Sequence, residues 1–138
     1  MKLVEIGIQG RATVKVTQSN LASSTGSGAV DVFSTPSLVL LMEEAAMDAL
    51  KPYMEPGESS VGTLVNIRHI SPTPLGLTVT ATATLTEIDG RRLVFHVEAR
   101  DELDKVGEGT HERFLISVDR FISRAREKST RRNTSSVE

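Results

Sequence analysis

An α+β fold is predicted from three features of the chain: one long helical segment, several strand-like segments, and short polar links between most of those segments. The chain has 138 residues, a length typical of one domain. Hydrophobic residues make up 38% of it and charged residues 25%, as in ordinary globular proteins. We therefore expect a single domain over residues 1–122, followed by a basic polar tail over residues 123–138 that is partly disordered.

The predicted helix begins near Thr35 and ends before Pro52. Thr35 is a suitable N-cap, and Pro36 suits the first helical position. Residues 37–51 are rich in good helix formers, and Pro52 cannot continue the helix. Because this segment is apolar over much of its circumference, we expect the rest of the fold to wrap around it.

Strands are predicted on both sides of this helix. Apolar and polar residues alternate over residues 12–17. Four later segments are also predicted strands: residues 61–70, 77–88, 93–100 and 107–118. Asp89-Gly90 is typical of a hairpin turn, and the later links are all short, so the sheet is expected to be antiparallel. One helix cannot cover both faces of five strands, so we predict a sheet curled around a long central helix, the hotdog fold.

The composition argues against several classes of function. The absence of cysteine excludes disulfides, thiolate catalysis and cysteine-ligated metal. A net charge of −2 and an aromatic content of 4% argue against nucleic-acid binding. The three histidines lack metal-ligand spacing, so no metal site is expected. Without a long apolar run or a secretory signal pattern, a cytoplasmic protein that does not bind membranes is expected.

Glu43 is the first candidate catalytic residue. Its helical neighbours at three and four positions are all apolar, whereas Glu44 shares its face with Asp48. Glu43 is therefore predicted to point inward. A carboxylate on an apolar face is costly unless it is paired, and such a setting suits a general base or nucleophile. The alternative is a residue at the rim of the apolar face that reaches water or an arginine.

Three further residues are candidates for the same site. His69, near the end of a predicted strand, is either a hydrogen-bonded core residue or a proton donor to a leaving group. Thr35 lies beside free helix amides that stabilise an oxyanion. About 12 Å of helical rise separates it from Glu43. The two share a site only if the chain folds back before Pro36 or if a second subunit contributes one of them. Gly62 is either a strand-start glycine or a point where ligand approaches the backbone.

Most of the chain resembles a known family. The similarity runs from about Phe33 to Phe121 and is strongest in EPGESSVGT, PLGLTVTATATL, IDGRRL and GTHER. These stretches are similar to the fluoroacetyl-CoA thioesterase group of the hotdog superfamily. The resemblance implies an acyl-CoA thioesterase that forms a homodimer or a tetramer and needs no metal or redox cofactor. A non-catalytic acyl-CoA binding module and a hotdog hydroxyacyl dehydratase are the alternatives, because one fold supports all three.

The resemblance also implies roles for the candidate residues. In that group a Thr, a Glu and a His form the catalytic set and a Gly lines the thioester site. These match Thr35, Glu43, His69 and Gly62. Glu43 would attack the thioester carbonyl or activate water, and the sequence leaves both routes open.

The loop before the helix departs from that group, which carries aromatic residues over the acyl site. Here the more distant aromatic position matches Ala29, and only Phe33, expected to bind substrate, lies near Thr35. A loop of small residues closes a pocket less completely than bulky rings do. We therefore expect hydrolysis of short acyl-CoA thioesters without a large preference for fluoroacetyl-CoA.

Overall fold

The computed structural model describes residues 1–137, with side chains described as far as Asn133. It contains the strands β1 (Gln9–Lys15), β2 (Glu58–His69), β3 (Thr78–Asp89), β4 (Arg92–Arg100) and β5 (Lys105–Ser117). The helices are α1 (Ala22–Thr25), α2 (Thr35–Leu50) and α3 (Val118–Val137), with 3₁₀ turns η1 (Gln18–Asn20) and η2 (Lys51–Tyr53).

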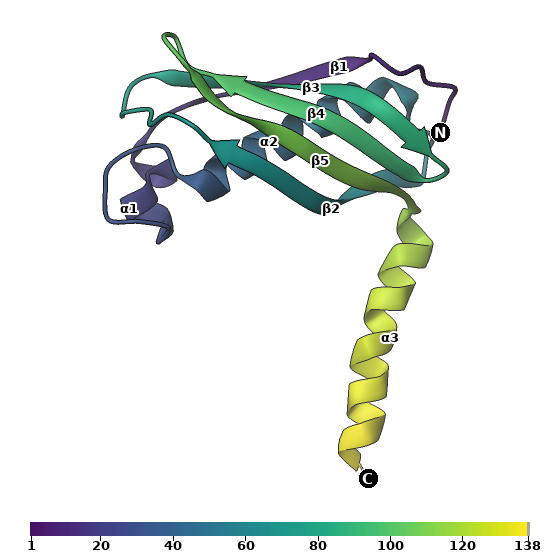
Figure 1. The fold of residues 1–138 in the computed structure, drawn as a ribbon. Helices are drawn as coiled ribbons and strands as arrows, with labels where there is room; N and C mark the ends of the chain where they lie inside the picture. Colours follow the sequence, from purple (N-terminus) through teal and green to yellow (C-terminus); the bar gives the residue numbers. More distant parts are fainter. Residues whose placement is uncertain (138) are drawn as a thin grey trace.

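The five strands form one antiparallel sheet in the order β1-β3-β4-β5-β2, which leaves β1 and β2 as edges. The sheet curls over the long helix α2, which lies against one of its faces (Figure 1). This arrangement is the predicted hotdog fold. Strand β1 begins at Gln9, three residues before the alternating segment, because pairing from Gln9 with Thr84 extends the ladder beyond the local pattern.

The core lies between the sheet and α2. Every second residue of β3 and β4 points toward the helix and is fully buried: Val79, Ala81, Ala83 and Leu85 on β3, and Leu93, Phe95, Val97 and Ala99 on β4. This alternation is the pattern expected when one sheet face is covered. The small alanines on both α2 and the sheet allow the helix to approach closely.

Ser34, and not Thr35, caps helix α2. The backbone N–H of Ser37 donates to the Ser34 hydroxyl at 3.2 Å, and Ser34 has extended dihedral angles. Serine and threonine are both good caps, so the local sequence did not distinguish them. Thr35 is the first helical residue, and its hydroxyl is therefore available for another partner.

Gly10 marks the closest approach of β1 to α2. A Cβ atom at this position would lie 2.2 Å from the Ala45 carbonyl oxygen and 2.2 Å from the Ala49 nitrogen. We expect Gly10→Ala to lower the free energy of unfolding by about 1–3 kcal/mol, because backbone atoms on both sides must move. Thermal unfolding checks this result. Gly28→Ala is the matched control, since its Cβ would meet only Ala22 at 3.4 Å, and an unchanged Tm for both variants would contradict the prediction.

Helix α3 leaves the body of the fold after β5 and points away from it (Figure 1). The sequence predicts a frayed, disordered tail from residue 123, whereas the helix continues to Val137. An ion pair between Glu127 and Arg131, at 3.6 Å and with i,i+4 spacing, supports the helical conformation. The domain boundary expected after residue 122 thus falls within a helix, and Glu138 lies outside the described residues.

No helix within residues 1–137 combines the length and the apolar character needed to cross a membrane.

Candidate active site

The first part of the site is a pair formed by Thr35 and His69. Thr35 begins α2, His69 ends β2, and the Thr35 hydroxyl lies 2.8 Å from His69 Nδ1. The other ring nitrogen, Nε2, is buried and has no hydrogen-bond partner within the described part of the chain. Burial holds the pKa of His69 below its ordinary value. The pair therefore contains a neutral imidazole whose Nε2 atom is buried and unpaired within the described residues.

A pocket of about 330 Å³ opens beside this pair. Thr35 and His69 form one wall, and Phe33, Gly28 and Val30 contribute to the rest. Phe33 is completely buried, so it forms a fixed part of the pocket wall. The pocket thus lies beside the loop that the resemblance predicts to cover the acyl group, and that role stays a prediction.

The second part of the site is built around Glu43 on α2. Its Oε2 atom lies 3.4 Å from Nη1 of Arg113, and Arg113 is opposite Gly62 in the β2–β5 ladder. A Cβ atom on Gly62 would lie only 2.7 Å from the same carboxylate oxygen. Glycine at position 62 therefore lets the carboxylate lie directly against the strand backbone.

Arg113 is held in one orientation by β2. Its Nε donates to the Ser60 hydroxyl at 2.7 Å, and its Nη2 donates to the Ser60 carbonyl at 2.9 Å. Its Nη1 lies 3.1 Å from Nε2 of His111. Since an arginine can only donate, His111 Nε2 accepts this bond, and His111 Nδ1 donates to the Leu64 carbonyl at 2.8 Å. Burial, together with the Arg113 charge, lowers the pKa of His111.

Arg113 and His111 are the site residues that the sequence analysis missed. Arg113 is only 3% exposed and His111 is fully buried. The available signal was the segment GTHERF, in which the two residues alternate on a predicted strand and so share one face. A buried arginine requires a partner, and here that partner is the carboxylate of Glu43.

The two parts of the site are separate within one chain. Thr35 and Glu43 are eight residues apart on one helix, which corresponds to about 12 Å along its axis. Glu43 faces Gly62 as the inward prediction requires, yet its side chain is 35% exposed. Leu40 and Met47, on the same side of α2, are 56% and 49% exposed. The chain itself therefore leaves this side of the helix uncovered.

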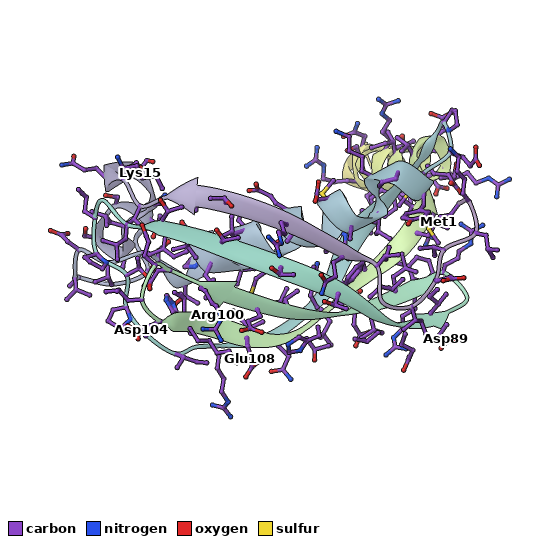
Figure 2. The ribbon with its side chains drawn as sticks, turned by 90° about the horizontal axis from the view of Figure 1, so that it is seen from above. Met1, Lys15, Asp89, Arg100, Asp104 and Glu108 are labelled. Atoms are coloured by element: carbon purple, nitrogen blue, oxygen red, sulfur yellow. The ribbon has the colours of Figure 1, made fainter. Side chains whose placement is uncertain are left out.

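A cluster outside this site has the composition of a metal site. His96, Glu98 and Glu108 place their ligand atoms within 4.8 Å of one another, and Figure 2 shows Glu108 near Arg100. Arg100 and Lys105 pair with these two carboxylates at 3.1 Å and 2.8 Å. The chain's own cations therefore already neutralise the carboxylates.

The partly buried His69 and the buried His111 should make stability depend on pH. Their pKa values lie below the ordinary 6.5, so the unfolded chain takes up protons first as the pH falls. Their stabilising contribution is therefore complete above about pH 6.5 and is lost as the pH falls toward the folded-state values. Denaturant titrations at pH 7, 6 and 5 measure the free energy of unfolding, and this free energy should fall less with falling pH in His69→Gln than in the wild type. His96→Gln, at an exposed position, is the control. An equal fall in the free energy of unfolding in all three proteins would contradict the prediction.

Comparison with solved structures places the chain among the hotdog thioesterases. A thioesterase superfamily member from Thermus thermophilus matches with a TM-score of 0.90 and 26% identity over 97% of this chain and 99% of that chain. A fluoroacetyl-CoA thioesterase matches with a TM-score of 0.86 and 37% identity over 92% of this chain and 98% of that chain.

Sequence comparison gives the family. The fluoroacetyl-CoA thioesterase of Streptantibioticus cattleyicolor is 48% identical over 99 residues, which cover 72% of this chain and 71% of that protein. The family model for fluoroacetyl-CoA-specific thioesterase matches residues 16–119. The chain therefore belongs to the fluoroacetyl-CoA-specific thioesterase family, and the predicted thioester hydrolase class is confirmed. Nearly all of α3 lies beyond the match.

Proposed function

We propose that the protein hydrolyses a short-chain acyl-CoA thioester to the free acid and CoA. The observation that carries this proposal is the Glu43 carboxylate, held against the backbone of Gly62 by the buried Arg113. Family membership supports the substrate class, and a variant of the fluoroacetyl-CoA thioesterase has been solved with acetyl-CoA. Hydrolysis by a carboxylate and water requires neither a metal nor a redox cofactor, and we propose that none is used.

The proposed enzyme is a homodimer. β2 is a free edge on which Leu64 and Val65 are 43% and 40% exposed. This edge lies near the uncovered side of α2 that carries Leu40 and Met47. An open edge and an adjacent apolar face are typical of a surface that a second copy covers. Further pairing to a tetramer and a cytoplasmic location stay predictions.

The proposed dimer brings the two parts of the site together. A two-fold axis that pairs the β2 edges makes the two α2 helices antiparallel. The start of α2, where Thr35 meets His69 of β2, in one subunit then approaches Glu43 in the other. Each of the two active sites therefore contains residues from both subunits.

The geometry of these groups supports a simple reaction sequence. Glu43 either attacks the thioester carbon or takes a proton from the water that does so. Amides at the start of α2 stabilise the negative charge that develops on the carbonyl oxygen. The Thr35 hydroxyl donates to His69 Nδ1, which leaves the single proton of the neutral ring on Nε2. The carbon–sulfur bond then breaks, and His69 Nε2–H donates a hydrogen bond to the departing thiolate. In the general-base route, the proton that Glu43 took from water passes to that sulfur. In the nucleophilic route, water subsequently hydrolyses the acyl–Glu43 intermediate.

Acyl specificity is the direct test of this proposal. Small residues such as Gly28 line the pocket, so it should not close tightly around the acyl group. We therefore expect acetyl-CoA, propionyl-CoA and fluoroacetyl-CoA to give kcat/KM values within about tenfold of one another, because an open pocket discriminates little between acyl groups of similar size. Release of free thiol is the measurement. A fluoroacetyl preference of several orders of magnitude would contradict the pocket argument. Tight binding without turnover would indicate a binding module, and enoyl product without thiol would indicate a dehydratase.

A further inference from the structure

A basic hollow lies where β5 continues into α3, outside the site described above. It has a volume of about 260 Å³ and is lined by Arg91 from the β3–β4 turn, Phe114 from β5, and Arg120, Phe121 and Arg124 from α3. Both rings are partly exposed, Phe114 by 42% and Phe121 by 41%. The hollow therefore combines three guanidinium groups with two accessible aromatic surfaces.

The three guanidinium groups lack close anionic partners. Within residues 1–133, whose side chains are described, no ion pair or hydrogen bond involves the side chain of Arg91, Arg120 or Arg124. Arg91 exerts only a longer-range attraction on Glu58, whose carboxylate binds the amino group of Met1 at 2.6 Å. Three unpaired cations around one hollow attract an anion that carries several charges.

The distribution of charge along the chain supports the same conclusion. Residues 118–137 carry six basic and two acidic side chains, whereas the chain as a whole has a net charge of −2. The positive charge is thus concentrated on α3. Arg120 and Arg124 are four residues apart and project from one side of the helix. A multiply charged ligand would contact both of them together with Arg91.

We propose that this hollow binds the phosphate-bearing nucleotide end of the CoA thioester. Guanidinium groups form paired, charge-assisted hydrogen bonds with phosphate oxygens, and an exposed ring gives the adenine base a stacking surface. The proposal rests on the function proposed above. It assigns a role to α3, most of which lies beyond residues 16–119, the region that the family model matches.

The distance between the hollow and the carboxylate suits this ligand. Arg113, which holds Glu43, precedes Phe114, and β5 continues to Ser117, about 13 Å further along the strand. In CoA about a dozen bonds separate the sulfur from the first phosphate, as many as in four residues of backbone. The extended arm of CoA therefore has about the same length as the stretch of β5 from Arg113 to Ser117. Leu115 and Ile116 both line the hollow. Because neighbouring strand residues point to opposite faces, the hollow lies at the end of the strand and not on one face.

The test compares a full and a truncated substrate. In the double variant Arg120→Ala, Arg124→Ala we expect KM for acetyl-CoA to rise about tenfold or more, because two charge-assisted contacts are lost. The values of kcat for acetyl-CoA and of KM for S-acetylpantetheine, which has no nucleotide, should not change. Arg126→Ala is the matched control, since Arg126 is on α3 but does not line the hollow. Alanine favours helix, and circular dichroism verifies that α3 is retained.

The outcomes separate this proposal from the proposed function. An unchanged KM for acetyl-CoA, or an equal rise for both substrates, would overturn the nucleotide site. If the wild type hydrolysed neither substrate, the proposed function would fail, and calorimetric titration with CoA would still test the hollow. Binding that is weakened in the double variant but not in Arg126→Ala supports the site, and equal binding by all three proteins overturns it.

Discussion

Glu43→Gln should lower kcat by about 10²–10⁴-fold, the usual contribution of a positioned acid–base group. The amide is nearly isosteric with the carboxylate and keeps an oxygen within reach of Arg113, so the fold should be preserved. It cannot attack the thioester carbon effectively or accept a proton from water. Steady-state thiol release measures the loss, and thermal unfolding verifies the fold.

Glu44→Gln is the matched control for this substitution. Glu44 is the next residue on α2 and is exposed, but the contacts with Arg113 and Gly62 are made by Glu43. We expect its turnover to match that of the wild type. Near-normal turnover in folded Glu43→Gln would exclude Glu43 from the chemical step, whichever of its two routes is considered.

Arg113→Lys should lower kcat by about 10–100-fold, because lysine keeps the charge but loses the planar fork that binds Ser60 and Glu43 together. KM should change less, since Arg113 acts by positioning Glu43. The free energy of unfolding should fall by about 1–3 kcal/mol, because the buried Ser60 carbonyl loses its bond from the guanidinium group.

Ser60→Ala separates positioning by Arg113 from a general loss of stability. It removes the hydroxyl that accepts one of the two hydrogen bonds donated by Arg113 to Ser60, and it leaves the guanidinium beside Glu43. We expect a smaller fall in kcat than in Arg113→Lys. If Arg113→Lys proved as stable and as active as the wild type, the fork geometry would have no role in the site.

The elements with strong local signals were predictable from the sequence. Helix α2 has a broad apolar face and a proline after it, and Asp89-Gly90 determines the β3–β4 hairpin. The predicted bounds were less accurate for elements that depend on distant pairing or on weak local preferences. The start of β1 depends on pairing with β3, and the length of α3 exceeds the expected frayed end.

The same distinction applies to the site. Thr35, Glu43, His69 and Gly62 could be selected because each stands out in its own segment. Arg113 could not, because its role depends on the pairing of β2 with β5, whose partners Gly62 and Arg113 are far apart in sequence. An apolar helix face also does not reveal whether the same chain or a second copy covers it.

The central claim is that each active site combines Glu43 of one subunit with Thr35 and His69 of the other. Glu43→Gln and His69→Ala chains, each inactive alone, test it when they are refolded together in equal amounts. In a mixed dimer one site then carries both defects and the other carries neither. We predict recovery of about a quarter of wild-type activity, since half of the dimers are mixed and each contains one intact site. No recovery in a mixture shown to contain mixed dimers would contradict the shared site.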